Sequence, residues 1–117
     1  MKTKYIVLAI LLSTSILSAR PSWCRNAGTY VEYHICENPR LWELDYDLVN
    51  VYNSVKSMLR YERRERRRLI KSERNWVSRR DRDCYMAGDY CIEQKYKNRI
   101  HQLYRMIGTI NRARDRY

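Results

Sequence analysis

The position of the cysteines constrains this chain more than any other feature of its sequence. The chain has 117 residues and four cysteines, and all four cysteines lie beyond the first twenty residues. Those first residues follow the three-part pattern of a secretory signal, with two lysines, an apolar stretch from Tyr5 to Leu12, and small residues that end at Ala19. Export places cysteines in an oxidising compartment, where thiols pair. The sequence therefore predicts a small exported domain held together by disulfides.

The boundaries of that domain follow from the same segment. We expect a signal peptide over residues 1–19, cleavage after Ala19, and one domain over residues 20–117. The apolar stretch is too short to cross about 30 Å of hydrocarbon, so no transmembrane segment is expected in the mature chain. A lipoprotein would need a cysteine where Arg20 stands. The prediction is a periplasmic or secreted protein that is not a lipoprotein.

The four cysteines are Cys24, Cys36, Cys84 and Cys91. A zinc site is the competing interpretation, but the intervals between these residues do not resemble the paired C-x2-C spacing of zinc knuckles. Four cysteines allow three disulfide connectivities. Of these we favour the two local loops, Cys24 with Cys36 and Cys84 with Cys91. No metal and no cofactor is expected.

The apolar residues recur at helical spacing. Thr29 and Glu32 fit a capping box that opens a short helix to Cys36, and Asn38 followed by Pro39 predicts the start of a long one. Two further apolar stripes follow, with a turn expected near Tyr61 between the second and third helices. The prediction is an all-α fold, a small disulfide-stapled helical bundle of one short and three longer helices. Asp89 is the expected N-cap of the last helix.

Positive charge is concentrated in one segment. The whole chain carries a net charge of +11, and residues 60–82 hold eleven cations against four anions. In one continuous helix, six of these cations would form a ridge opposite Leu69 and Trp76: Arg60, Arg64, Arg67, Lys71, Arg74 and Arg82. One interpretation is a solvated face that keeps the protein soluble. The other is a site for an anionic surface such as lipopolysaccharide or anionic lipid, with nucleic acid disfavoured by export.

Three charged residues fall on the apolar side of their predicted helices. Asp45 and Arg80 are interpreted as a partly buried ion pair between the second and third helices, with Arg99 competing for the carboxylate. The alternative is that they bind a partner. Catalysis is not expected, because His34 and His101 have no neighbouring serine or free cysteine that they would activate. We therefore expect no catalytic residues and no enzyme.

The order of these residues resembles the N-terminal domain of the LprI lysozyme inhibitor family. The resemblance runs from about Ser22 to Leu103. It rests on both cysteine spacings together with Ala27, Thr29, Glu32, Ile35, Pro39, Leu41, Leu44, Asp45, Tyr52, Leu69, Trp76, Arg80, Asp81, Tyr96, Arg99 and Leu103. Two features depart from the family pattern: Glu73 stands where glutamine is common, and residues 60–68 are unusually basic.

The resemblance implies a small helical exported domain that binds a protein, and a lysozyme is the candidate partner. Two functions therefore compete. The first is a non-enzymatic lysozyme inhibitor that plugs a cleft with an exposed loop or helix edge. The second is a basic module that binds anionic envelope or lipid surfaces through the arginine-rich helix. Animal lysozymes are basic, so long-range repulsion opposes the first function, although repulsion is screened beyond about 10 Å at physiological salt.

Overall fold

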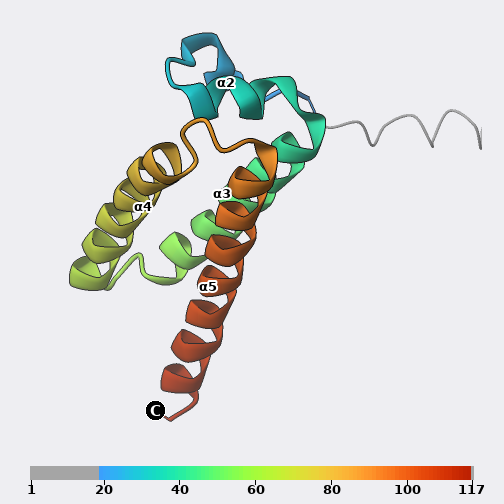
Figure 1. Cartoon of the computed structure of the whole chain (residues 1–117). Coiled ribbons are helices and arrows are strands. Elements are labelled where there is room, and N and C mark those ends of the chain that lie inside the picture. The colour runs from blue at the N-terminus through green and yellow to red at the C-terminus, as the bar shows by residue number, and fades with distance from the viewer. Residues whose placement is uncertain (1–18, 117) are drawn as a thin grey trace, which may run out of the picture.

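The structure, a computed structural model, describes residues 19–116. The predicted signal peptide lies outside these residues, except for Ala19. The described chain contains a short 3₁₀ helix, η2 (Ser22–Asn26), and four α-helices: α2 (Tyr30–Glu37), α3 (Pro39–Met58), α4 (Arg63–Asp83) and α5 (Asp89–Asp115) (Figure 1). No strand occurs among residues 19–116. The predicted all-α fold of one short and three longer helices is confirmed.

Local sequence signals explain where two of the four α-helices begin, α2 and α3. The Thr29 hydroxyl accepts a hydrogen bond from the Glu32 amide at 3.1 Å, and the Asn38 side chain accepts one from the Arg40 amide at 3.0 Å. Each bond satisfies an amide that has no partner within its helix. The prediction for α5 is wrong by one residue, because Gly88 is the N-cap and Asp89 is already helical.

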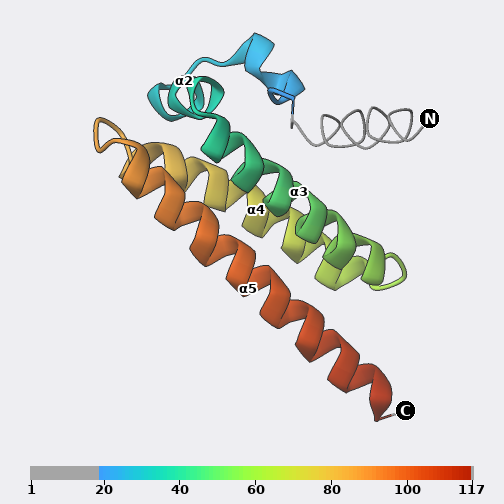
Figure 2. The same cartoon turned by 90° about the vertical axis from the view of Figure 1, so that its right-hand side faces the viewer.

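The three long helices alternate in direction. α3 and α5 run the same way and pack most extensively against each other, and α4 runs antiparallel to both (Figure 2). The expected turn after α3 is present, because α3 ends at Met58 and α4 begins at Arg63. The four α-helices share one apolar core: Val31, Ile35, Leu41, Leu48, Val51, Val55, Leu59, Leu69, Trp76, Cys84, Ile92, Tyr96 and Leu103.

Both disulfides lie at the end of the bundle that carries α2. Cys24 and Cys36 are joined with an Sγ–Sγ distance of 2.04 Å, and Cys84 and Cys91 with one of 2.05 Å. The first ties η2 to α2, and the second closes the connection between α4 and α5. These are the two local loops that the cysteine spacing favoured. In the described part of the chain, no helix is long and apolar enough to cross a membrane.

Candidate functional site

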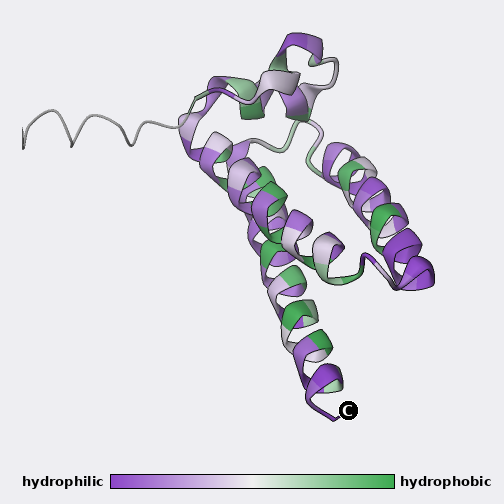
Figure 3. Cartoon of the chain, turned by 180° about the vertical axis from the view of Figure 1, so that it is seen from behind, coloured by the Kyte–Doolittle hydropathy of each residue, from purple (hydrophilic) through white to green (hydrophobic). Residues whose placement is uncertain are grey.

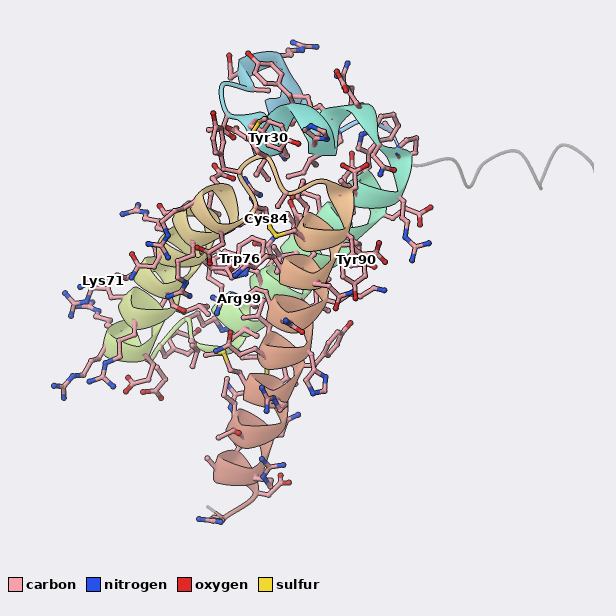
Figure 4. The ribbon with its side chains drawn as sticks, viewed as in Figure 1. Tyr30, Lys71, Trp76, Cys84, Tyr90 and Arg99 are labelled. Carbon is pink, nitrogen blue, oxygen red and sulfur yellow. A yellow bond between two sulfur atoms is a disulfide. The ribbon has the colours of Figure 1, made fainter. Side chains whose placement is uncertain are left out.

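The loop closed by Cys84 and Cys91 presents large side chains to solvent. Tyr85, Met86 and Tyr90 are 66%, 70% and 75% exposed. Tyr90 lies in the first turn of α5 and points away from the bundle (Figure 4). Exposed tyrosine and methionine side chains are typical of protein-binding surfaces, and tyrosine offers a large contact area with few rotatable bonds. We name residues 84–91 the disulfide loop.

The backbone of the disulfide loop has an unusual conformation. Met86 has a φ of 58° and Gly88 a φ of 85°. Glycine adopts positive φ readily, but a side chain such as that of methionine makes this conformation costly. The contacts around the loop must therefore hold Met86 in place.

Three contacts hold the loop beyond the disulfide itself. The Asp89 carboxylate accepts a hydrogen bond from Asn38 Nδ2 at 3.0 Å, and its other oxygen lies 3.0 Å from His34 Nδ1. The ring of Tyr85 meets that of Tyr30 edge to face, with 5.7 Å between centroids. These contacts join the loop to α2 and to the start of α3. A loop ordered before binding loses less conformational entropy on binding.

The segment around the loop carries no positive charge. Residues 83–94 contain three acidic residues and no lysine or arginine. Hydrogen bonds from Lys95 and, with a smaller effect, from Arg82 hold the pKa of Asp83 below its ordinary value. Lys97 and Arg40 lower the pKa of Glu93 in the same way. Asp83 and Glu93 therefore stay ionised at neutral pH, and the segment has a net negative charge within a strongly basic chain.

A buried polar chain lies beneath the loop, where α3, α4 and α5 meet. Asp45 accepts hydrogen bonds from Tyr96 Oη at 2.8 Å and from Trp23 Nε1 at 3.0 Å. Arg80 Nη1 donates to Tyr96 Oη at 3.0 Å, and Arg80 also pairs with Asp81 at 2.9 Å. Burial, only partly offset by Arg80, raises the pKa of Tyr96, so its hydroxyl stays protonated and can serve both partners.

This arrangement corrects the predicted ion pair. Among the described residues, Asp45 has no lysine or arginine nitrogen within 4.0 Å, because the Tyr96 hydroxyl lies between Asp45 and Arg80. Arg99 does not compete for Asp45 either. It lies between α4 and α5 (Figure 4) and faces Glu73, with 3.5 Å between Arg99 Nη2 and Glu73 Oε2. Asp45, Arg80 and Arg99 are all buried in the same core. Asp45 and Arg80 both bond to Tyr96, whereas Arg99 faces Glu73.

A comparison with protein families now identifies the group to which the chain belongs. A family model described as lysozyme inhibitor LprI matches residues 24–103. The chain belongs to the LprI family. The match begins at the first disulfide cysteine and includes the disulfide loop and the buried polar chain. No curated protein and no solved structure matches this LprI-family chain.

The LprI-family chain carries its positive charge on the outer face of α4. Five of the six predicted ridge residues lie on α4 and are exposed: Arg64, Arg67, Lys71, Arg74 and Arg82. α4 is predominantly hydrophilic (Figure 3), and Lys71 points away from the bundle (Figure 4). Within residues 19–116, Arg82 pairs with Asp83 and the other four have no ion-pair partner. We name these four the α4 ridge.

Arg60 does not belong to this ridge. It precedes α4, in the turn after α3, and its guanidinium lies 5.1 Å from the centre of the Tyr61 ring. The helix begins three residues later than the ridge pattern assumed. Arg60 therefore cannot share the spacing of the α4 residues.

The sequence analysis missed the residues that make the disulfide loop distinctive. Tyr85, Met86 and Tyr90 lie between two cysteines beside a glycine, and that grouping was the available signal. Trp23 was also missed, although its indole nitrogen has to find an acceptor when it is partly buried. Within residues 19–116, no three histidine, cysteine, aspartate or glutamate side chains form a group that could hold a metal ion.

Replacing Glu73 with glutamine should change the pH dependence of stability in this LprI-family chain. Burial raises the pKa of Glu73, and Arg99 offsets the effect only in part. The folded state therefore binds more protons than the unfolded state between the ordinary pKa and the raised one. Across that interval, the contribution of Glu73 to the free energy of unfolding falls as the pH rises.

The variant lacks this loss, so its free energy of unfolding should improve relative to the native protein as the pH rises above the ordinary pKa of a glutamate. Urea unfolding at several pH values measures the difference. The other carboxyl groups are common to both proteins, so their contributions cancel in the difference between the two free energies of unfolding. A difference that shrinks as the pH rises would contradict the assignment.

Proposed function

We propose that this chain is an exported inhibitor that binds a lysozyme by inserting the disulfide loop into the substrate cleft. It acts by binding, without chemistry of its own. The observation that carries the proposal is the loop, which is exposed, aromatic and held by contacts on both sides. Membership of a family of lysozyme inhibitors names the class of partner.

The form of the loop suits the inhibition of an enzyme with a groove. Tyr85, Met86 and Tyr90 supply anchors of the kind that carry most of the binding energy at interfaces. The disulfide and the contacts of Asp89 keep these anchors in one arrangement before the partner arrives. The conformational cost of binding is then small.

The distribution of charge also favours an approach by this end. Residues 20–117 carry 22 cations and 13 anions, a net charge of +9, which would repel a basic lysozyme at long range. The α4 ridge accounts for four of these cations, and residues 83–94 contribute three anions and no lysine or arginine. Contact through the loop therefore brings a segment without lysine or arginine to the partner. The repulsion from α4 is screened beyond about 10 Å at physiological salt.

Export is part of this proposal. The two disulfides and the family fit an exported protein. The signal peptide over residues 1–19 would deliver the chain to the periplasm or the medium, and Arg20 stands where a lipoprotein would need its lipid-accepting cysteine. A periplasmic or secreted protein would share a compartment with a lysozyme.

A binding experiment with purified proteins tests the proposal. The oxidised mature protein is immobilised and exposed to lysozymes of several classes at low and high salt. We expect one class to be retained, with its association faster at high salt because screening reduces the repulsion between two basic proteins. Retention of no lysozyme at either salt concentration would sink the proposal.

The α4 ridge supports a second candidate function, binding to an anionic envelope surface. Its four side chains are exposed and have no ion-pair partner within the described part of the chain. Each cation near an anionic bilayer contributes about 1 kcal/mol. Replacing all four with glutamine, a good helix former, should leave the fold intact and weaken binding to phosphatidylglycerol vesicles by about a hundredfold or more at low salt. Inhibition of a lysozyme should stay unchanged or become faster.

If the same variant binds vesicles as well as the native protein does, the α4 ridge is a solvated face and not a binding site.

A further inference from the structure

A groove lies between α4 and α5 at the end of the bundle far from the disulfide loop. Beyond their loop the two helices diverge (Figure 1), and the groove between them has a volume of about 560 Å³. Its apolar lining comes from α4, α5 and the turn after α3: Leu59, Leu69, Met106 and Ile110. Ser72, Gln102 and Thr109 add hydroxyl and amide groups.

Two arginines flank the apolar lining from opposite walls. Arg68 comes from α4 and Arg105 from α5, and both are exposed. Neither has an ion-pair partner within 4.0 Å among residues 19–116. Glu65 is the one acidic residue of the lining, so the groove itself carries a net positive charge.

A buried cation behind the groove adds to that charge. Gln102, which lines the groove, accepts a hydrogen bond from Arg99 Nη1 at 2.8 Å. Arg99 is only 2% exposed, and its Nε and Nη2 atoms have no hydrogen-bond partner. Its nearest carboxylate, that of Glu73, is 3.5 Å away. Glu73 therefore balances part of the charge of Arg99, and Arg99 supports the groove from behind through Gln102 without lining it.

We propose that this groove binds a single-chain anionic amphiphile, with its acyl chain on the apolar lining and its head group between Arg68 and Arg105. The volume lies within the range of about 300–1,000 Å³ that is usual for small-molecule sites. Guanidinium groups suit this role, because each one can make two parallel hydrogen bonds to a carboxylate or phosphate.

Charge selects this occupant over a second copy of the chain. A second copy would bring a further +9 to a groove that is already cationic, and the two would repel each other. An anionic amphiphile is attracted by the arginines and buries its chain at the same site. This inference goes beyond the proposed inhibition, which uses the opposite end of the molecule, and either can fail without the other.

Calorimetric titration with laurate, below its micelle concentration, tests the proposal. Dodecyltrimethylammonium has an alkyl chain of similar length to that of laurate and the opposite charge, so it serves as the matched control ligand. We expect laurate to bind with one site per chain and the cationic ligand to bind at least about tenfold more weakly. Equal affinity for the two ligands, or no binding of laurate, would overturn the proposal.

Two variants with the same loss of charge locate the site. Replacing Arg68 and Arg105 with glutamine should weaken laurate binding by about tenfold or more, whereas replacing Lys71 and Arg74 should change it by less than about twofold. All four side chains are exposed, so both variants should fold. A third variant, Thr109→Trp, should fill the groove and abolish binding.

Equal weakening by the two charge variants would mean that laurate is held by general attraction to the surface, and would overturn the groove assignment. Binding of phosphatidylglycerol vesicles without binding of monomeric laurate would also overturn it. That result would place the lipid contact on the α4 ridge.

Discussion

Replacing Tyr85 and Tyr90 together with alanine is expected to raise the inhibition constant for the target lysozyme by about a hundredfold or more. Both side chains are exposed on the disulfide loop, and each anchor of this type contributes about 2 kcal/mol or more when it is buried at an interface. Neither ring is buried in the core of the bundle, so the free energy of unfolding should change little beyond the loss of the contact between Tyr85 and Tyr30. The measurement is the rate at which the lysozyme clears a suspension of bacterial cell walls.

The matched control replaces Tyr61 and Tyr104 with alanine. These two tyrosines are 83% and 60% exposed but lie on the turn after α3 and on the later part of α5, away from the loop. The control should inhibit as well as the native protein. If both double variants lose inhibition equally, the loop is not the site of contact.

Replacing Asp45 with alanine is expected to lower the free energy of unfolding by about 2–4 kcal/mol. The variant would leave two buried or partly buried donors, Trp23 Nε1 and Tyr96 Oη, without their acceptor. A buried donor that loses its partner costs about 1–3 kcal/mol. Urea unfolding of the oxidised protein measures the change.

Asp47 provides the control for this prediction, because it lies on the same helix and is exposed. Asp47→Ala should alter stability by less than about 0.5 kcal/mol. Should Asp45→Ala unfold like the native protein and yet lose its partner, Asp45 would be a contact residue and the structural role would be wrong.

The parts of the fold that depend on local interactions could be predicted from the sequence. Thr29 and Asn38 cap helices through atoms two or three residues away, so their effect can be recognised without a tertiary structure. The pairing of Cys84 with Cys91 is equally local. The error at Asp89 has a tertiary cause, since its carboxylate bonds to His34 and Asn38 instead of to its own helix.

The helical periodicity of the sequence could not predict the hydrogen bonds of the buried polar chain. Helical spacing placed Asp45, Arg80 and Tyr96 on inward faces, and all three are buried. It could not show that the Tyr96 hydroxyl lies between the two charges, because that depends on the relative shift of α3, α4 and α5 along their axes. The same shift places Glu73, and not Asp45, opposite Arg99.

The form of the candidate site was unpredictable for a related reason. Tyr85 and Tyr90 are exposed on a loop in which Met86 and Gly88 adopt positive φ, and the positive φ of a methionine has no sequence signature. The spacing of Arg60 from Arg64 fitted the ridge, but the turn after α3 ends only at Glu62 and removes Arg60 from the helix. Where a turn ends depends on the packing of both helices around it.

Competition with a substrate fragment tests the central claim, that the disulfide loop occupies the cleft of a lysozyme, most directly. The dissociation constant of the complex is measured by titration calorimetry with and without a saturating chitin oligosaccharide, which itself binds in the cleft. We predict simple competition: the apparent dissociation constant keeps rising linearly with the oligosaccharide concentration, because no ternary complex forms. An unchanged constant, with both ligands bound to the lysozyme at once, would contradict the account.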